Sequence, residues 1–319
     1  DIKMISKYIK KDNFEIFSNN YSFKSHKIIF KFINLIIFFL FSFSLFFKLR
    51  NKNVDVVISS TPSLVTLPIG FFISLYKKSK FIIEIRDIWS DSLKDLNIIK
   101  SNIIYKFIKN FEIFFYSKAK LLVSVSNNIK NRIKLNKRHV VFTNFASIDL
   151  IDNQNLYTRN SITKINKSKI LILYLGTLGL SHEFDLLFNI IKINNSIELN
   201  IVGEGTQKKN LAKIIKNENI SNIILNGYSN SHKILSQFYN KSNYCLIILK
   251  NIDIFSTVIP SKLFECAFLK KIIIYYGPKN EASELIDKYK IGFTSHSIDD
   301  LKKIINNLNN IEIDYYDYN

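Results

Sequence analysis

A lysine and a glutamate three residues apart, Lys262 and Glu265, are the pair in this sequence best suited to chemistry. They follow Pro260, and we predict that a helix begins there, because proline fits the first position of a helix, where its missing N–H is not needed. Lys262 and Glu265 then share one helical face near a positively polarised N-terminus. This arrangement suits a sugar diphosphate, with Lys262 toward phosphate oxygens and Glu265 accepting hydrogen bonds from ribose hydroxyls. Taken alone, the stretch fits an ordinary amphipathic helix with a solvated lysine and glutamate better.

The positions of the glycines are a second feature that indicates a ligand-binding site. The chain has only eight glycines, and seven fall in its second half. Four of them, Gly176, Gly203, Gly227 and Gly277, stand at or just past the carboxyl end of a predicted strand. Ligands bind at that edge of open α/β sheets, and glycine lets the backbone come close to them. The alternative is that these glycines simply make turns, but other turns of this chain use Asn, Ser and Lys.

Apolar runs that alternate with helical segments must position these residues. In the first half we predict strands at 55–59, 80–85, 121–125 and 139–143, and helices at 62–75, 102–116 and 129–135. In the second half we predict strands at 170–175, 197–202, 223–225, 244–249 and 272–276, and helices at 184–193, 208–216, 233–239, 261–268, 282–289 and 299–308. Continuous apolar strands separated by helices indicate α/β domains with parallel sheets covered on both faces. The length of 319 residues suits two domains. The polar segment 152–168 is the best linker, so we place the domains at 1–155 and 156–319.

The composition narrows the classes of function. A hydrophobic fraction of 47% supports real cores. Cys245 and Cys266 lie in apolar runs, which favours a reducing compartment, and the five histidines lack ligand spacing, so we predict no metal site. The net charge of +19 suggests nucleic acid as a partner. However, lysine is frequent throughout and no basic block is interleaved with aromatic residues, so we predict no nucleic-acid partner. A surface facing anionic lipid fits the charge at least as well.

A dense apolar segment, 28–47, lies between Lys27 and Lys48. A bilayer span needs about 20 apolar residues, but Lys31 and Asn34 interrupt this run early. Three alternatives remain: a transmembrane helix, a helix lying in the membrane interface, and a buried or half-buried helix of the first domain. We favour the last two.

Taken together, the motifs resemble a known family. In the second half they are Tyr174 to Gly179, Ile201 to Gly205, Asn226 to Tyr228, Leu249-Lys250, Ile259 to Glu265, and Gly277 with Glu281-Ala282. In the first half they are Asp55 to Pro62, Arg86 to Trp89, and Ser124 to Ser126. Their order and spacing resemble the retaining glycosyltransferases of family 4, and more closely the WbuB-like branch that builds bacterial surface polysaccharides. The resemblance implies the GT-B architecture, an α/β fold of two facing Rossmann-like, doubly wound domains.

By that resemblance the second domain holds the nucleotide sugar. The implied binding residues are Gly176, Thr177, Gly203, Glu204, Gly227, Tyr228, Lys250, Ser261, Lys262 and Glu265. Glu265 matches the family glutamate that holds the ribose, and the loop at Gly227 and Tyr228 matches the one whose backbone reads the base. Glu204 fits a plain turn residue equally well.

The sequence departs from the family pattern in two places. Thr257 stands where many members carry a second glutamate, and His182 and Glu183 replace an Arg and Lys pair, so Lys250 is the expected substitute cation. In addition, nothing before Ile28 resembles the first strand of the family, and residue 1 is not Met. We therefore expect a first domain that is incomplete and a chain truncated at its N-terminus.

The resemblance implies a retaining transfer that needs charge stabilisation of the leaving diphosphate and no protein nucleophile. Asp87 is the expected catalytic residue on the acceptor side, together with Glu265; the alternative for Asp87 is an N-cap. We expect no cofactor and no metal, a UDP-sugar donor, and a lipid-linked or saccharide acceptor in O-antigen or capsule synthesis. The expected location is cytoplasmic and peripheral, at the inner face of the plasma membrane.

Two other functions compete with a transferase. A dinucleotide-dependent dehydrogenase would need Gly-x-Gly-x-x-Gly, and the spacing of Gly176 and Gly179 does not match it. The other is an inactive, membrane-associated remnant or scaffold of such a transferase.

Overall fold

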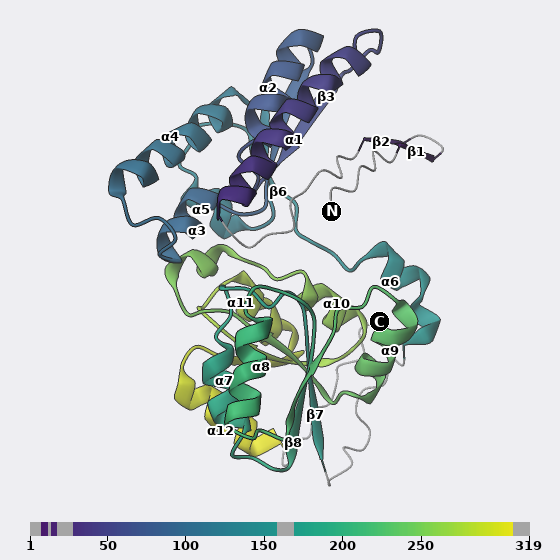
Figure 1. Cartoon of the computed structure of the whole chain (residues 1–319), viewed down its shortest axis with the longest axis vertical. Coiled ribbons are helices and arrows are strands. Elements are labelled where there is room, and N and C mark those ends of the chain that lie inside the picture. The colour runs from purple at the N-terminus through teal and green to yellow at the C-terminus, as the bar shows by residue number, and fades with distance from the viewer. Residues whose placement is uncertain (1–7, 12–13, 18–27, 158–168, 309–319) are drawn as a thin grey trace. The chain divides into compact units, whose positions relative to one another are not determined.

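The computed structural model describes residues 8–11, 14–17, 28–157 and 169–308 (Figure 1). Internal contacts divide the chain into two compact units. Unit 1 comprises 1–90, 101–124 and 135–140, and unit 2 comprises 91–100, 125–134 and 141–319. The sequence placed a boundary after residue 155. The structure instead groups everything from Val141 onward, together with two short earlier segments, in unit 2.

Unit 1 is built on a four-stranded sheet whose strands lie side by side in chain order. The strands are β3 (Val56–Ser60), β4 (Lys80–Ile85), β5 (Leu121–Ser124) and β6 (His139–Val141). β3 pairs with β4, and β4 with β5, in parallel. The long helices are α1 (Ile28–Lys48), α2 (Thr66–Lys77) and α4 (Asn102–Lys118). The aromatic ring of Phe71 on α2 lies 6.0 Å from that of Phe81 and 5.8 Å from that of Phe115, so aromatic packing joins α2 and α4 to the sheet.

The structure corrects the sequence-based elements of unit 1 in three places. α2 begins at Thr66 and not at Pro62, because the Thr66 hydroxyl donates to the carbonyls of Ser60 and Ser63 and holds the intervening residues in a turn. A short helix that was not predicted, α3 (Trp89–Asp95), follows β4. Near the start of the chain, β1 (Tyr8–Lys11) and β2 (Phe14–Phe17) form an antiparallel ribbon that is not part of the four-stranded sheet.

Unit 2 contains a six-stranded sheet in the order β12-β11-β10-β7-β8-β9. Its strands are β7 (Ile170–Leu175), β8 (Ile197–Val202), β9 (Ile223–Asn226), β10 (Tyr244–Ile248), β11 (Ile272–Tyr276) and β12 (Gly292–Ser295). All neighbouring pairs are parallel. β12 was not predicted; the other five strands were.

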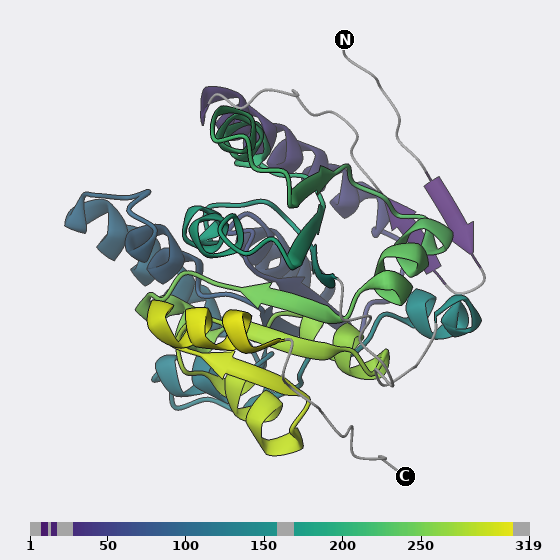
Figure 2. The same ribbon diagram turned by 90° about the horizontal axis from the view of Figure 1, so that it is seen from below.

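Helices cover both faces of this sheet (Figure 2). One face carries α7 (Phe184–Ile191), α8 (Lys208–Asn217) and α12 (Ile298–Asn307). The other carries α9 (His232–Lys241), α10 (Lys262–Phe268) and α11 (Glu281–Tyr289). Because parallel crossovers are right-handed, helices switch face where the strand order reverses, between β7 and β10. The predicted α/β class with parallel sheets is confirmed.

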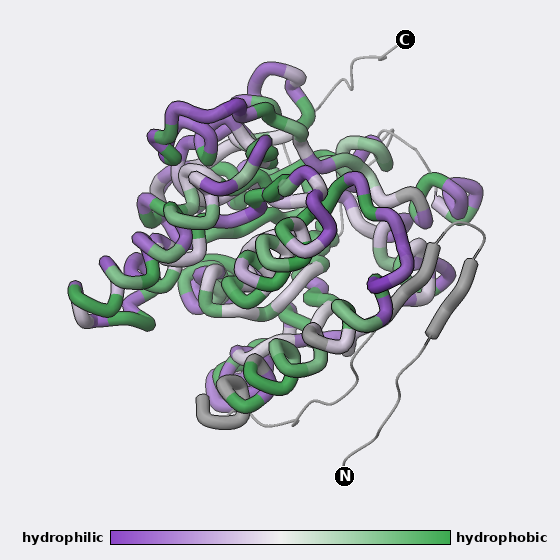
Figure 3. The backbone as a smooth tube through the Cα atoms, turned by 90° about the horizontal axis from the view of Figure 1, so that it is seen from above, coloured by the Kyte–Doolittle hydropathy of each residue, from purple (hydrophilic) through white to green (hydrophobic). Residues whose placement is uncertain are grey.

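The apolar segment 28–47 forms most of α1. Its tube is mostly green in Figure 3, the colour of hydrophobic residues. α1 packs on α2, and the rings of Phe46 and Tyr76 lie 5.6 Å apart. Within the described residues, no helix is both long enough and apolar enough to cross a membrane.

Candidate functional site

A cavity of about 370 Å³ lies at the carboxyl edge of the unit 2 sheet. Its lining residues follow three neighbouring strands and include one helix residue: Leu175, Gly176, Thr177, Val202, Gly203, Glu204, Tyr228, Ser229 and Lys262. The cavity adjoins the end of β7, where the strand order reverses. Ligands of open α/β sheets bind at this topological switch point.

Backbone from two turns forms part of the cavity wall. A Cβ atom added to Gly203 would lie 1.8 Å from the carbonyl oxygen of Gly176. The two turns are also hydrogen-bonded, since the amide of Gly176 donates to Val202 over 3.0 Å and that of Leu178 donates to Glu204 over 2.8 Å. Only glycine at position 203 allows this close approach. The predicted residues Gly176, Thr177, Gly203 and Glu204 are therefore brought together.

The Lys262 and Glu265 pair lies on one face of α10, as the spacing predicted. The helix begins at Lys262 and not at Pro260, because Pro260 and Ser261 form the turn that leads into it. Lys262 lines the cavity, and its Nζ lies 2.5 Å from Oε2 of Glu265. The Glu265 side chain is only 15% exposed and is not among the lining residues. Lys262 thus forms part of the cavity lining, whereas Glu265, although paired with it, does not.

Two tyrosines that the sequence did not single out interact with Glu265, one through a hydrogen bond and one through its charge. The Tyr239 hydroxyl donates to Oε2 of Glu265 over 3.5 Å. Burial, and then the charge of Glu265, raise the pKa of Tyr157. The Tyr157 hydroxyl lies 2.9 Å from Nδ1 of His232 at the start of α9. Apart from the proximity of Tyr157 to the expected linker, no sequence pattern marked these residues.

Glu204 and Tyr228 lie at the exposed rim of the cavity. Glu204 pairs with Lys208, which holds the pKa of the glutamate below its usual value. Gly227, next to Tyr228, is not itself a lining residue, and a Cβ atom added there would meet nothing within 4 Å.

Lys250 and Ser261, also predicted for the site, are not lining residues of the cavity. Ser261 is exposed at the turn before α10. Lys250 follows β10, and its amide donates to the carbonyl of Ser181 over 2.8 Å. Burial lowers the pKa of the neighbouring His182, and the charge of Lys250 lowers it further, against the effect of a hydrogen bond with Gly179. Both effects favour the neutral imidazole of His182 over its cation.

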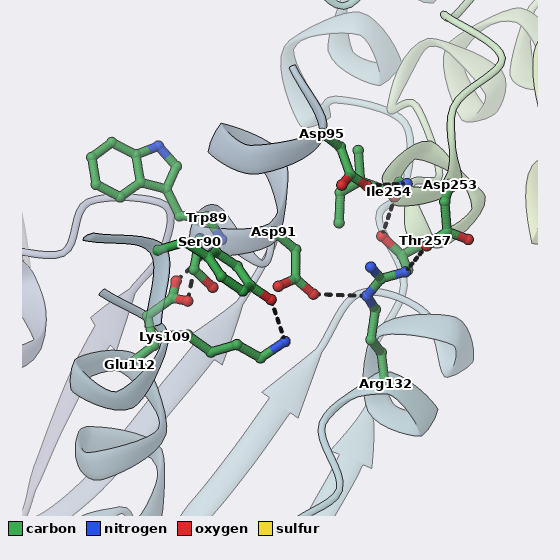
Figure 4. Close-up of polar contacts among 11 residues, drawn as sticks. Trp89, Ser90, Asp91, Asp95, Lys109, Glu112, Arg132, Asp253, Ile254 and Thr257 are labelled. Carbon is green, nitrogen blue, oxygen red and sulfur yellow. Dashed lines mark hydrogen bonds and ion pairs between the residues drawn. The ribbon is translucent and has the colours of Figure 1, made fainter. Parts of the chain in front are cut away.

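Asp87 belongs to unit 1, after β4. Burial raises its pKa to about 6, although Arg86 opposes the shift. The alternative role of an N-cap falls to another residue: the first two amides of α3, Trp89 and Ser90, donate to the carboxylate of Glu112 over 3.1 and 3.2 Å (Figure 4). Asp87 is thus a half-buried carboxyl group whose pKa lies near neutrality. Across the described part of the chain, no three His, Cys, Asp or Glu side chains are grouped to hold a metal ion.

Residues 158–317, half of the chain, match the sequence profile of the family described as "Glycosyl transferases group 1". A curated relative is the poly(ribitol-phosphate) alpha-N-acetylglucosaminyltransferase of Staphylococcus aureus (strain COL), 27% identical over 203 residues. That match covers 57% of this chain and 38% of the relative, so the chain spans well under half the length of that protein.

Two solved structures illustrate the similarity of fold. Sucrose-phosphate synthase from Thermosynechococcus elongatus aligns with a TM-score of 0.63 at 10% identity, over 84% of this chain and 67% of that one. The Anabaena protein HepE in complex with UDP-glucose aligns with a TM-score of 0.60 at 15% identity, over 83% and 71% of the two chains. At these identities the likeness concerns the fold alone.

Proposed function

Because this chain belongs to the glycosyl transferases group 1 family and has a GT-B-like α/β fold, we propose that it transfers a sugar from a nucleotide-sugar donor. The proposal rests on the cavity at the carboxyl edge of the unit 2 sheet, which Lys262 lines. A UDP-sugar is the proposed donor. UDP-glucose is bound by the fold relative HepE, and the S. aureus relative is named for transfer of N-acetylglucosamine.

In the proposed mechanism, the diphosphate leaves from this cavity. Negative charge develops on the diphosphate as the glycosidic bond to it breaks, and Lys262 stabilises that charge. The ribose is the proposed ligand of Glu265, which would exchange its bond to Lys262 for bonds to the ribose hydroxyls. When the phosphates bind Lys262, its ammonium group gains an anionic partner, and the Glu265 carboxylate accepts hydrogen bonds from the ribose hydroxyls.

Retention of configuration and an acceptor-side role of Asp87 complete the proposal. The relative from S. aureus is named for an alpha linkage, which supports retention when the donor is also alpha-linked. The raised pKa of Asp87, about 6, suits a group that accepts a proton from an acceptor hydroxyl. We propose a saccharide or lipid-linked acceptor of a surface polysaccharide such as O-antigen or capsule, since the relative acts on poly(ribitol-phosphate).

A peripheral location at the cytoplasmic face of the membrane is proposed from the surface of unit 1. An apolar groove of about 440 Å³ lies among α1, α2 and α4 and is lined by Phe39, Leu64, Val65, Pro68, Phe107, Ile108 and Phe111. On α4, Ile103 is 81% exposed and Phe107, one turn later, is 72% exposed. Exposed Lys106 and Lys118 lie on the same helix. Apolar side chains combined with lysines are typical of helices that lie in an anionic membrane interface.

Sedimentation with vesicles tests this location. We expect the protein to bind phosphatidylglycerol vesicles and to bind phosphatidylcholine vesicles weakly. The double variant Ile103→Asp/Phe107→Asp should release it from the anionic vesicles, whereas Ile193→Asp, which changes an exposed isoleucine of unit 2, should not. Equal binding by the double variant and the wild type would exclude this face.

Calorimetric titration of UDP, followed by assays of UDP-glucose and UDP-N-acetylglucosamine turnover, tests the transferase proposal. Glu265→Ala should weaken UDP binding by at least about tenfold, as expected for hydrogen bonds to a charged group. The matched control is Glu218→Ala, which removes an exposed glutamate of unit 2 paired with Lys192. Turnover unchanged in Glu265→Ala would remove Glu265 from the site. A wild-type protein that binds neither UDP nor either sugar nucleotide would favour the inactive scaffold.

A further inference from the structure

The segment that precedes α10 is held by side chains from two distant parts of unit 2. This segment is the 3-10 helix η2 (Asp253–Thr257), and three residues after it Pro260 begins the turn into α10. The side chains that hold it come from α3 and from α5 (Asn127–Arg132), whose chain positions are more than 100 residues earlier. Only residues 258–261 separate η2 from the start of α10, where Lys262 lies.

Arg132 bridges two carboxylates, one of which belongs to η2 (Figure 4). Its Nε donates to Asp91 over 2.8 Å, and its Nη1 donates to Asp253 of η2 over 2.6 Å. The Asp91 side chain is 3% exposed, whereas that of Asp253 is 75% exposed. Burial lowers the pKa of Arg132, but the bonds to both carboxylates outweigh this effect and raise it. The guanidinium thus links the buried carboxylate of Asp91 on α3 to Asp253 of η2, because its planar group of N–H donors can bond to both carboxylates at once.

Three hydrogen bonds from α3 and the start of α5 reach the backbone of η2. The hydroxyl of Ser126, the buried N-cap of α5, donates to the carbonyl of Thr257 over 2.7 Å. The side-chain amide of Asn128 donates to the carbonyl of Ser256 over 2.8 Å. The amide of Ile254 donates to Asp95 over 3.1 Å. Side chains of α3 and of the start of α5 thus contact η2 at Ile254, Ser256 and Thr257 as well as at Asp253.

We propose that Arg132, with Ser126 and Asn128, is a positioning residue for the donor cavity: it sets η2, and through η2 the place of Lys262 and Glu265. The inference rests on the proposed function for the identity of the ligand, but the geometry of α10 can be measured without one. α5, which contacts η2, follows directly on β5 of unit 1 in the chain.

Two readouts test the proposal with Arg132→Met, Arg132→Lys and, as the matched control, Lys192→Met, which breaks an exposed ion pair elsewhere in unit 2. In Arg132→Met we expect hydrogen exchange of the amides of residues 262–268 to quicken and UDP binding to weaken about tenfold. Arg132→Lys should recover part of both effects, because lysine keeps the charge without the fork. Lys192→Met should change neither.

Unchanged exchange of residues 262–268 in a folded Arg132→Met protein would overturn the proposal. If Arg132→Met does not fold, Asp253→Asn carries the same test, because the Asp253 carboxylate is exposed and its loss leaves Asp91 paired with Arg132. A wild-type protein without affinity for UDP would overturn the proposed function, while the exchange measurement would still decide whether Arg132 positions α10.

Discussion

The cavity of unit 2 and the helical groove of unit 1 show how two units with parallel sheets can present different chemistry. In unit 2 the cavity lining combines charged and polar residues such as Glu204, Tyr228 and Lys262 with glycines and the apolar Leu175 and Val202. In unit 1 the groove among α1, α2 and α4 is lined by apolar side chains alone. The architecture is shared, so the side chains at strand ends and on helix faces decide whether a charged or an apolar partner fits.

The largest expected effect is the loss of stability when a glycine at the unit 2 cavity is substituted. Gly203→Ala should lower the free energy of unfolding by about 3 kcal/mol, because the new methyl group would overlap the carbonyl of Gly176. Gly227→Ala, where the added methyl group meets nothing, should stay within about 0.5 kcal/mol of the wild type. Urea unfolding of both variants measures the difference. Equal stability of the two variants would mean that the turns after β7 and β8 are not packed as described.

In unit 1, Asp87 should make the stability of the protein depend on pH. Its pKa rises on folding from 3.8 to about 6, so the folded protein binds the proton more tightly than the unfolded chain. Stability therefore falls as pH rises from about 4 to 6, by up to about 3 kcal/mol, and stays lower above that range. Asp87→Asn should remove this loss: the variant should be more stable than the wild type at pH 7. Parallel urea-unfolding profiles for the two proteins from pH 4 to 7 would contradict the shift.

The smallest expected difference is between the effects on UDP binding of substituting the two lysines predicted for the nucleotide site. Lys262 lines the cavity and Lys250 does not. We expect Lys262→Met to weaken UDP binding by about tenfold, or 1.4 kcal/mol, and Lys250→Met to weaken it by less. Calorimetric titration measures both. A larger loss in Lys250→Met would make Lys250 the principal cation, as the family resemblance suggested.

Local sequence pattern was enough to predict most of the unit 2 fold. β11 is buried along its whole length, so it appears in the sequence as a continuous apolar run. β12 was missed because it is an edge strand with a half-buried Gly-Phe-Thr-Ser sequence. The start of α2 was misplaced because Thr66 bonds to Ser60 and Ser63, which no propensity of Pro62 reveals.

For the candidate site, too, the sequence predicted the residues that belong to local motifs. Gly176, Gly203 and Lys262 were found because strand-end glycines and a helix after proline are visible in sequence. The arrangement behind them was not, since Arg132 meets partners 41 and 121 residues away. Tyr157 and Tyr239 were missed for the same reason: their places beside Glu265 depend on how α9 and α10 pack, not on a nearby motif.

Photolabelling with 5-azido-UDP, followed by peptide mapping, tests the central claim most directly. The label should fall on peptides containing residues 175–177, 202–204 or 228–229, three chain segments that line the cavity, and excess UDP should protect them. Labelling confined to residues of unit 1, or labelling that UDP does not prevent, would contradict the claim that this sheet edge binds the nucleotide.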